Sequence, residues 1–498
     1  MNSDTIFDPA DDKLKEECGV VGIYSYHRAV GIYGIDDAAT LAVLGLHALQ
    51  HRGQEATGMV TFDGDDFHAH RASEMVGKAY GEPEIMERLT GSQAIGHNRY
   101  STSGDTTSRN IQPLYADLSF GGLAIAHNGN LTNAATLRSD LVNRGAIFQS
   151  TSDTEVIVHL MALSSKKTPV DRLIEALKQV EGAFSVVVNI KGSVIGARDP
   201  HGVRPLVLGR LEKGHVLASE SCALDIMGAE YVRDIEPGEL VVLDSEGVHS
   251  KRPFDEKPSR FCIFEYIYFA RPDSRMESRS VYEIRKNIGA ELAVESPCDE
   301  ADLVVPVPDS GVPAAIGFAN KSGKPFDLGI IRSHYIGRTF IQPGQHTRNL
   351  GVKMKHNANA ALIEGKKIVL VDDSIVRGTT SRKIVDMLRQ AGAAEVHMRV
   401  SSPPTSHSCF YGIDTPSTGE LMAHKMNVEE ICEYIGADSL AYISIDGLYR
   451  AVGETKRNND MPQYCDACFT GEYALPLTDH ENKSSTAKVT DLRERQGK

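Results

Sequence analysis

The residues best suited to chemistry follow one short apolar run. Ile368 to Val371 are apolar, and two adjacent carboxylates, Asp372 and Asp373, come directly after them. An apolar run of this length is typical of a strand that is buried on both faces. A helical pattern then continues to about Gly392, which is the expected stop. The loop between strand and helix contains Ser374, Arg377, Gly378, Thr379 and Thr380.

This arrangement suits phosphate and hydroxyl groups. Backbone N–H groups at a helix N-terminus can hold a phosphate, and the helix dipole adds about half a positive charge there. Carboxylates can bind sugar hydroxyls or hold Mg²⁺ against a diphosphate. An ordinary strand-to-helix turn could carry the same acidic pair, and the Gly-Lys-Ser/Thr of a P-loop is not present in the stretch. The residues favour phosphate binding, with a plain turn as the alternative.

Cys18 is the second candidate. It follows an acidic leader, Met1 to Glu17, and opens a strand-like run that ends at Tyr24. Many cysteines on strands are simply buried packing residues. Four other strings set polar residues close to glycine or to an apolar run, as substrate-binding loops do. They are His51 to Gly58, Gly96 to Thr102, His127 to Asn130 and Ser152 to Glu155. The residue types alone leave packing and catalysis both open.

Cysteine spacing provides a third signal. Eight cysteines in 498 residues are too few for a disulfide scaffold, which leaves metal binding or catalysis as special uses. Cys465 and Cys468 form a short chelating pair, which by itself could bind zinc, serve redox chemistry or do neither. Three of the other cysteines, Cys222, Cys298 and Cys432, have no assigned partners, and we expect them to be packing residues.

A basic segment lies between two predicted elements of the second half. Leu328 to Ile363 contains five Arg or Lys residues and no acidic residue, although the protein is acidic. Its basic residues are Arg332, Arg338, Arg348, Lys353 and Lys355, and its glycines include Gly337, Gly344 and Gly351. A basic surface loop is one interpretation. We favour a movable lid over a diphosphate, because glycines allow movement and cations attract phosphate.

Composition excludes several classes of protein. A net charge of −14 argues against nonspecific nucleic-acid binding, which needs a basic face. No apolar run is long enough to cross a membrane, and the acidic leader lacks the apolar core of a secretory signal. The cysteine count fits a reducing compartment. We therefore expect a cytoplasmic protein with no nucleic-acid or membrane partner.

The pattern of elements predicts two domains. Strands and helices mix up to about residue 247, a proline-containing linker covers 251–260, and strand and helix then alternate. Alternation predicts a parallel sheet with ligands at the carboxyl ends of its strands. Capping boxes are expected at Ser152 to Glu155 and at Ser280 to Glu283. The predicted boundaries are 1–17 for a propeptide, 18–250 and 261–470 for two domains, and 479–498 for a disordered tail.

The second domain carries a family resemblance. Val369 to Thr380 resembles the phosphoribosyl-diphosphate (PRPP) signature of type I phosphoribosyltransferases. The resemblance implies that Asp372 and Asp373 contact ribose hydroxyls or metal, and that Ser310 joins them around one Mg²⁺ per subunit. It also implies that the basic segment closes over PRPP and completes an ammonia channel. The implied 5′-phosphate loop is Ser374, Arg377, Gly378, Thr379 and Thr380.

The first domain resembles the class II glutamine amidotransferases, which have an N-terminal nucleophile. The resemblance implies that the leader is removed, so that the free α-amine of Cys18, with a pKa of roughly 7.7–8.0, can act as a base. Cys18 would then attack the glutamine amide, with Asn128 and Gly129 stabilising the oxyanion. The implied glutamine-binding residues are Arg99 for the α-carboxylate, Asp153 for the α-amine, and Arg52 and Thr102 along the pocket. Ser101 departs from the proline or alanine common in the family.

The order of the motifs, from Cys18 to about Pro476, resembles the amidophosphoribosyltransferase family in its subgroup with a leader and an iron–sulfur cluster. The implied fold combines α+β and α/β parts: an N-terminal-nucleophile αββα glutaminase domain precedes a type I phosphoribosyltransferase domain with a mainly parallel sheet. One [4Fe–4S] cluster per subunit is implied on four cysteines, because thiolates suit iron clusters as well as zinc. They are Cys262, Cys409, Cys465 and Cys468.

The implied activity is a glutamine-dependent amination of PRPP. It would produce 5-phosphoribosylamine, glutamate and diphosphate, as the first committed step of purine synthesis, in a homotetramer inhibited by purine nucleotides. A PRPP-sensing regulator is one alternative, but it would need a DNA-binding module and would leave the Cys18 strings without a role. A different class II amidotransferase, such as one making glucosamine 6-phosphate, would lack the PRPP signature.

Overall fold

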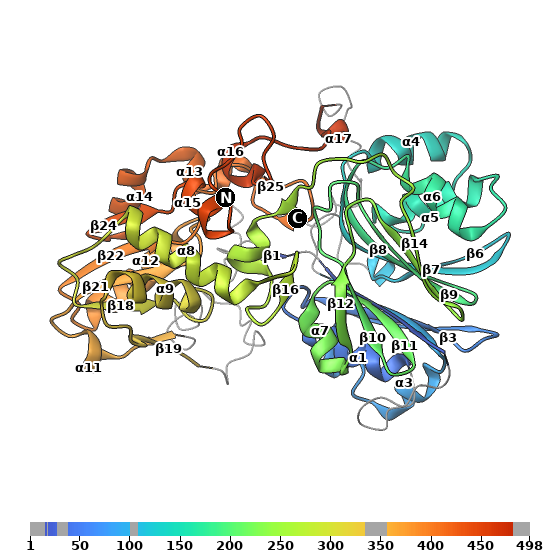
Figure 1. The fold of residues 1–498 in the computed structure, drawn as a ribbon, viewed down its shortest axis with the longest axis horizontal. Helices are drawn as coiled ribbons and strands as arrows, with labels where there is room; N and C mark the ends of the chain where they lie inside the picture. Colours follow the sequence, from blue (N-terminus) through green and yellow to red (C-terminus); the bar gives the residue numbers. More distant parts are fainter. Residues whose placement is uncertain (1–14, 17, 27–37, 100–107, 334–355, 482–498) are drawn as a thin grey trace, which may run out of the picture.

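The computed structural model describes residues 15–16, 18–26, 38–99, 108–333 and 356–481. Two lobes lie side by side, one built from the N-terminal half of the chain and the other from the C-terminal half (Figure 1). Several predicted features fall outside the described residues. They are most of the leader, Ser101, Thr102, and the part of the basic segment that holds Gly337, Arg338, Gly344, Arg348, Gly351, Lys353 and Lys355.

The N-terminal lobe contains two stacked antiparallel sheets. The first sheet has the order β12-β10-β11-β2-β5-β3-β4. Its strands are β2 (Gly19–Ser25), β3 (Ala56–Phe62), β4 (Phe67–Ala72), β5 (Gln93–Arg99), β10 (Val207–Leu211), β11 (Gly214–Ala218) and β12 (Glu230–Asp234). The second sheet has the order β14-β13-β9-β8-β7-β6. Its strands are β6 (Leu114–Leu118), β7 (Gly121–Leu131), β8 (Gly182–Ile190), β9 (Ser193–Arg198), β13 (Leu240–Asp244) and β14 (Gly247–Lys251).

Helices cover the outer faces of both sheets. The first sheet packs against α1 (Ala38–Ala48), α2 (Val76–Ala79), α3 (Pro83–Arg88) and α7 (Ser221–Met227), and the second against α4 (Ala134–Asn143), α5 (Thr154–Leu163) and α6 (Pro169–Leu177). Strand β2 shows why the layers form. Val21 and Ile23 point into the helix-covered core, while Val20 and Tyr24 point between the sheets, as a two-residue period requires. The expected αββα architecture is confirmed.

The C-terminal lobe is built on a four-stranded parallel sheet with the order β18-β21-β22-β24. The strands are β18 (Leu303–Pro306), β21 (Lys367–Asp372), β22 (Glu395–Val400) and β24 (Ser439–Tyr442). One face packs against α8 (Val281–Glu295), α9 (Val312–Ser322) and α15 (Ile445–Ala451), and the other against α12 (Thr379–Gln390) and α14 (Val428–Ile435). The parallel sheet is confirmed, although β24 was not predicted.

One short strand of the C-terminal half forms outside this sheet. Strand β19 (Ile330–Arg332) pairs antiparallel with β20 (His356–Ala358) and makes a separate ribbon. Phe326, four residues before β19, bridges to Val304 of the main sheet. Short elements complete the lobe: β16 (Arg275–Met276), β17 (Arg279–Ser280), α11 (Ala360–Ile363), β23 (Ile413–Asp414), η4 (Thr418–Glu420) and α13 (Met422–Lys425). None of the helices in the described ranges has the length and apolar character needed to span a bilayer.

One predicted capping box is wrong and the other forms only in part. Helix α5 is capped by Asp153, not Ser152, and the Glu155 carboxylate accepts hydrogen bonds from Ser150 and from the backbone of Gln149. The loop that precedes α5 therefore binds the Glu155 carboxylate, which would be needed to complete a capping box. Helix α8 does receive a cap from Ser280, whose hydroxyl accepts from the Glu283 N–H at 3.3 Å.

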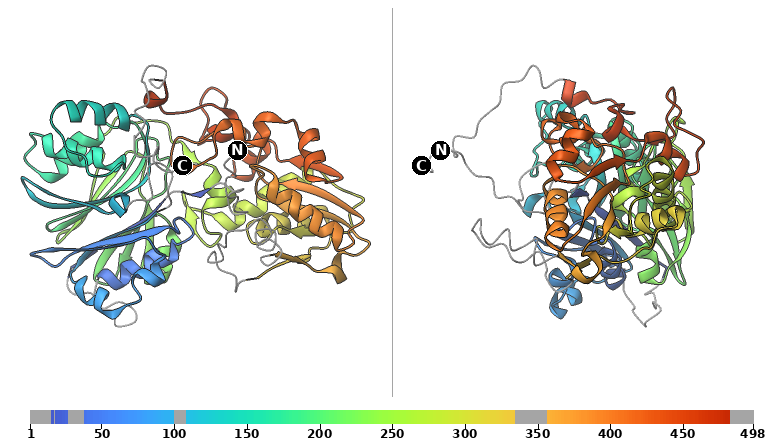
Figure 2. Two further views of the ribbon diagram at one scale, coloured as in Figure 1. Left: turned by 180° about the vertical axis from the view of Figure 1, so that it is seen from behind. Right: turned by 90° about the vertical axis from the view of Figure 1, so that its left-hand side faces the viewer.

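The two lobes share a core at their junction. β15 (Phe261–Cys262), β25 (Tyr464–Cys465), α16 (Ala467–Thr470) and the π-helical turn η3 (Glu265–Phe269) lie there. Ala183 and Val203 of the N-terminal lobe pack into the same apolar cluster as Phe261. At the end of the leader, β1 (Lys15–Glu16) pairs antiparallel with β23. The left-hand view of Figure 2 shows the two lobes and the junction between them from behind.

The C-terminal segment returns to the N-terminal lobe. Helix α17 (Thr478–Glu481) lies beside α4 in Figure 1, and the Asp479 carboxylate accepts from the N–H groups of Ala135 and Thr136. Residues 479–481 were expected to belong to a disordered tail. They are ordered because a carboxylate at a helix N-terminus satisfies donors that the helix leaves unpaired.

Candidate functional site

The first sheet brings three predicted residues together at one edge. Cys18 is buried with φ 66° and directly precedes β2. Gly19 pairs with Asn98 of β5, so the antiparallel register places Cys18 opposite Arg99 at the end of that strand. A Cβ added to Gly19 would lie 3.5 Å from the Cβ of Arg52. The backbone at Cys18 therefore lies close to those of Arg52 and Arg99, which are distant from each other in sequence.

The second sheet supplies the predicted oxyanion residues. Asn128 on β7 is fully buried, and its side-chain oxygen and nitrogen have no hydrogen-bond partner among the described residues. Gly129 has φ 144°, and a Cβ there would lie 2.1 Å from the carbonyl oxygen of Ala183. Leaving a buried amide unpaired costs about 1–3 kcal/mol, so such a group marks a position where a ligand binds.

Asp153 is held next to this strand. Its carboxylate accepts from the N–H of Leu131 at 2.9 Å and lies 3.6 Å from Nδ1 of His127. Burial opposes its ionisation, but His127 and hydrogen bonds from the backbone of Leu131 and Thr154 outweigh burial and lower the pKa of Asp153. The carboxylate is therefore ionised and oriented, as recognition of an ammonium group requires.

A buried polar set behind β7 was not predicted. The Gln112 side chain accepts from the backbone N–H of His127 at 2.8 Å and donates to the Thr154 hydroxyl at 3.0 Å. Burial, followed by the charge of Arg99, lowers the pKa of His97 to about 3, so this imidazole is neutral. His97 and Thr154 lie inside strings chosen from the sequence. Nothing in its local pattern distinguishes Gln112.

The predicted PRPP site forms at the carboxyl ends of β18 and β21. The Ser310 hydroxyl donates to Oδ1 of Asp373 at 2.5 Å, and Ser374 donates to Oδ2 at 2.7 Å. The backbone N–H of Asp373 donates to Asp372 at 2.9 Å. A Cβ on Gly311 would lie 2.5 Å from the Val371 carbonyl oxygen, so glycine permits this close approach. The structure thus places Ser310 beside Asp373, one of the two predicted aspartates.

The loop after the aspartates leads into α12. Gly378 is the residue before the helix and has φ 73°, a conformation that favours glycine. The Thr379 hydroxyl is buried and has no hydrogen-bond partner among the described residues. Arg377 forms an ion pair with Glu420 at 2.9 Å, and Arg332, from the basic segment, pairs with Asp309. The helix N-terminus is therefore open to a ligand through backbone N–H groups and a hydroxyl.

The four cysteines of the predicted cluster meet at the junction of the lobes. Cys262 and Cys465 pair in register between β15 and β25, and Cys468 lies on α16. The N–H of Tyr411 donates to Sγ of Cys409 at 3.3 Å. Burial raises the pKa of Cys262 to about 12 and raises those of Cys465 and Cys468 well above the usual value, and neighbouring cysteines add to each shift. The thiols are close enough to interact electrostatically.

Comparison with known proteins decides the family. The chain is 54% identical to the amidophosphoribosyltransferase of Rhizobium etli over 97% of both chains. It is 46% identical to the amidophosphoribosyltransferase of Bacillus subtilis, covering 93% of this chain and 95% of that protein. This chain belongs to the amidophosphoribosyltransferase family. Family membership favours the predicted enzyme over a PRPP-sensing regulator or a different amidotransferase.

Family models and solved structures agree with the two lobes of this chain. A model described as a glutamine amidotransferase domain matches residues 97–225, and a phosphoribosyl transferase domain model matches residues 282–403. The Bacillus subtilis PRPP amidotransferase complexed with ADP and GMP superposes with a TM-score of 0.86 and 45% identity, covering 92% of this chain and 98% of that one. A second structure, of an allosteric regulatory enzyme of purine biosynthesis, has the same score and identity.

Arg52 also connects the lobes. Its guanidinium pairs with Glu220 at 2.5 Å and with Glu265 at 2.7 Å, and Arg204 reaches Glu265 at 3.0 Å. All four side chains are buried, and Glu265 belongs to η3 at the junction. Arg52 was predicted only as a pocket residue. Glu220 and Glu265 were not predicted, because each lies more than 150 residues from Arg52.

We expect Glu220→Gln to lower the free energy of unfolding by about 3–5 kcal/mol, because it leaves a buried arginine with one fewer carboxylate. Glu230→Gln, which breaks an exposed pair with Arg210, should cost under about 1 kcal/mol. Denaturation midpoints of the two variants provide the comparison. Equal midpoints would contradict a stabilising role for the network.

The effect of Glu220→Gln should depend on pH. Burial alone would raise the pKa of Glu220, but His51 and Arg52 together lower it below its usual value of 4.5. A carboxyl group with a lowered pKa stabilises the fold above its unfolded pKa and loses that contribution as the pH falls. The stability difference between wild type and variant should therefore be complete at neutral pH and shrink below about pH 4.5.

Proposed function

We propose that this chain transfers the amide nitrogen of glutamine to PRPP, producing 5-phosphoribosylamine, glutamate and diphosphate. The observation that best supports this proposal is that one chain contains two different sites. One lobe contains a buried cysteine and a buried amide without a hydrogen-bond partner among the described residues, and the other sets a buried carboxylate pair before a helix N-terminus. A single-activity protein would have no use for one of them.

In the first half-reaction we propose that Cys18 attacks the glutamine amide carbon. Removal of residues 1–17 would expose its α-amine, which takes the thiol proton and passes it to the leaving ammonia. Asn128 and the N–H of Gly129 would stabilise the oxyanion. Water then hydrolyses the thioester. Substrate binding falls to Arg99 and Asp153, with Arg52 and Thr102 as further pocket residues.

In the second half-reaction we propose that ammonia attacks C1 of PRPP and diphosphate leaves. Asp372 and Asp373 would hold the ribose hydroxyls, and with Ser310 they would also hold one Mg²⁺. The residues fit that ion, because carboxylate and hydroxyl oxygens are its preferred ligands. When bound, Mg²⁺ neutralises charge on the diphosphate. The loop Ser374, Arg377, Gly378, Thr379 and Thr380 would hold the 5′-phosphate, and the basic segment would exclude water.

An assay of the purified protein tests this proposal directly. Incubation with glutamine, PRPP and Mg²⁺ should release glutamate and diphosphate in equal amounts, and either substrate omitted should stop diphosphate release. Diphosphate release from PRPP without glutamine, or glutamate formation with no diphosphate at any PRPP concentration, would contradict the two-site mechanism.

We also propose that Cys262, Cys409, Cys465 and Cys468 hold one [4Fe–4S] cluster. No three of their sulfur atoms lie within 4.8 Å of one another, although all four residues are described. Four sulfurs around a single tetrahedral zinc would lie about 3.8 Å apart, since each Zn–S bond is about 2.3 Å. A cluster accepts wider spacing because each thiolate binds a different iron. The N–H of Tyr411 aimed at Cys409 supports the same assignment.

Cys465→Ser should abolish iron binding and reduce the yield of soluble protein severely. Three thiolates leave one iron open to oxidation, and metal binding is coupled to folding at this junction. Iron and labile sulfide per chain provide the measurement. Cys432→Ser, in the same lobe on α14, is the matched control and should keep its iron. An active, soluble, iron-free Cys465→Ser protein would disprove the cluster proposal.

We base two further proposals, one on regulation and one on assembly, on the relatives. The Bacillus subtilis PRPP amidotransferase was solved with ADP and GMP, and we propose that purine nucleotides also inhibit this chain, in a cytoplasmic homotetramer. We also propose that the chain divides into a propeptide at 1–17, two domains at 18–250 and 261–470, and a tail that follows α17. Sedimentation analysis and inhibition by GMP with ADP test the assembly and the regulation.

A further inference from the structure

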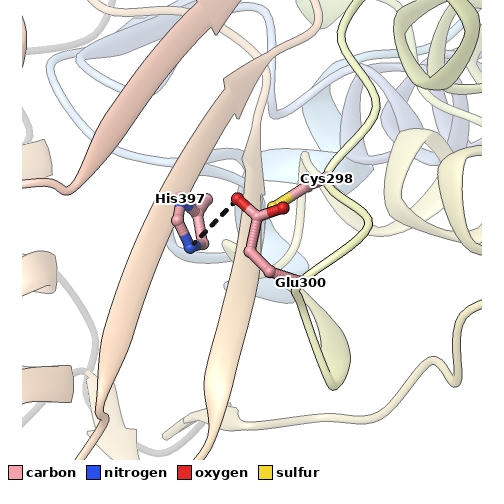
Figure 3. A group of neighbouring side chains, drawn as sticks. All are labelled: Cys298, Glu300 and His397. Carbon is pink, nitrogen blue, oxygen red and sulfur yellow. Dashed lines mark ion pairs between the residues drawn. The ribbon is translucent and has the colours of Figure 1, made fainter.

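A cysteine, a glutamate and a histidine meet at the amino-terminal edge of the parallel sheet (Figure 3). Cys298 and Glu300 lie on the loop between α8 and β18, and His397 lies on β22. One ligand atom of each lies within 4.8 Å of the other two, and Glu300 is 3.9 Å from Nε2 of His397. We propose that these three side chains bind one zinc ion. Cys298, expected from sequence to be a packing residue, thereby becomes a ligand.

The donor set and its dimensions fit zinc. Thiolate, imidazole and carboxylate are the three common zinc ligands in proteins, with bonds of about 2.3, 2.0 and 2.0–2.2 Å. Two such ligands around a tetrahedral ion lie about 3.3–3.8 Å apart. Contraction from the present spacing needs about 1 Å of side-chain movement. Glu300 is exposed and can supply that movement, whereas Cys298 and His397 are buried. Water would occupy the fourth position.

A second layer of contacts orients the histidine. Nδ1 of His397 lies 3.0 Å from the hydroxyl of Ser439 on the neighbouring β24. A zinc-bound histidine usually hydrogen-bonds through its other ring nitrogen, which fixes the ring orientation. Nε2 is thereby turned toward Glu300. Glu395 also lies 3.0 Å from Nε2, but Lys367 holds its other oxygen at 2.6 Å and can retain it when zinc binds.

Charges around the three residues balance an added ion. When the thiol is ionised, Cys298, Glu300 and Glu395 provide three negative charges, and Lys367 and Arg399 provide two positive ones. A divalent cation would therefore leave little net charge. Arg399 bonds to the carbonyl oxygens of Ser296 and Pro297 and so fixes the loop that carries the cysteine. The thiol proton is released to solvent when the Zn–S bond forms.

This site is separate from the two reaction centres and from the proposed cluster. Asp372 and Asp373 lie at the carboxyl end of the sheet, whereas Cys298 precedes β18 and His397 lies near the start of β22. Zinc would tie the loop after α8 to strand β22 of the sheet. Its expected role is structural, because a ligand that binds only the folded state stabilises that state.

Labelling of the purified, iron-loaded enzyme tests the proposal without a variant. The enzyme is first dialysed against a chelator too weak to remove iron. It is then alkylated with and without ZnCl₂, and mass spectrometry of the peptide that contains Cys298 measures the rate of labelling. Zinc at about ten times its dissociation constant should slow labelling of Cys298 about tenfold. Labelling of Cys432, which lies on α14, should not change. An unchanged rate at Cys298 would overturn the proposal.

Metal content provides the second test. Equilibrium dialysis against ZnCl₂ should load wild type and Cys432→Ser with one more zinc per chain than Cys298→Ser or His397→Asn. Iron measured in the same samples shows whether zinc has instead replaced iron at the four-cysteine site. Zinc should also raise the unfolding temperature of wild type but not of Cys298→Ser. Equal zinc in wild type and both ligand variants would mean that the three residues bind no metal.

Discussion

A chain that begins at residue 18 and carries Cys18→Ala will lose glutamine-dependent synthesis by a factor of at least about 10⁴ and will keep ammonia-dependent synthesis. Loss of a covalent nucleophile removes the whole acyl-transfer route, and comparable losses in other enzymes reach about 10⁶. The PRPP site is untouched, because Ser310 and Asp373 lie in the other lobe. Ammonia-dependent product should rise with pH as more ammonia becomes unprotonated.

The measurement is diphosphate release with glutamine or with ammonium salt as nitrogen source. Cys222→Ser is the matched control, since Cys222 is also buried in the N-terminal lobe. Burial and the neighbouring Glu220 raise the pKa of Cys222, so its thiol stays protonated and cannot act as the nucleophile. The control should therefore keep glutamine use. Loss of both activities in folded Cys18→Ala protein would show that Cys18 serves the PRPP site too.

The start of the mature wild-type protein bears on the same prediction. If the α-amine of Cys18 is the base, the intact mass of active enzyme should correspond to a chain that begins at residue 18. If active enzyme retains residues 1–17, Cys18 has no free α-amine. The α-amine would then not be the base that activates the thiol.

Asp373→Asn should lower kcat/KM for PRPP by about 10²–10³ while glutaminase activity without PRPP stays unchanged. Losing one preorganised electrostatic contact in a buried site commonly costs this much. Both oxygens of Asp373 accept hydroxyl hydrogen bonds, from Ser310 and Ser374, and the buried carboxylate faces the proposed Mg²⁺ position. An amide has one acceptor fewer and no charge, so it can accept a hydrogen bond from only one of these serines at a time with its oxygen, and it binds a cation poorly.

Kinetics with ammonia as nitrogen source isolate the effect on PRPP. Asp386→Asn, the same substitution at an exposed position of α12, should stay within about twofold of wild type. Normal PRPP kinetics in Asp373→Asn would rule out a role for the carboxylate. A loss of basal glutaminase activity would show instead that the substitution disturbs both lobes.

Much of the fold could be read from local patterns. One contiguous stretch contains the apolar run before Asp372, the small-residue loop and the helix to Gln390. Its strand and its helix can each be recognised from the spacing of their own apolar residues. The parallel sheet followed from alternation of such segments. Strand β24 was missed because its residues are only half-buried and its pattern is weak. The ribbon of β19 and β20 was missed because pairing partners cannot be read from a strand alone.

The residues of the candidate sites could likewise be predicted only in part. By itself the sequence determined the candidate nucleophile, the acidic pair, the phosphate loop and the chelating Cys465 and Cys468, because each is a short string of chemically distinctive residues. Only the tertiary structure decided that Ser310 touches Asp373, that Arg52 pairs with Glu220, and that Cys298 meets His397. Those partners are 63 to 168 residues apart, and packing alone brings them together. Local periodicity carries no information about such contacts, since it reports which face a residue occupies and not what lies against that face.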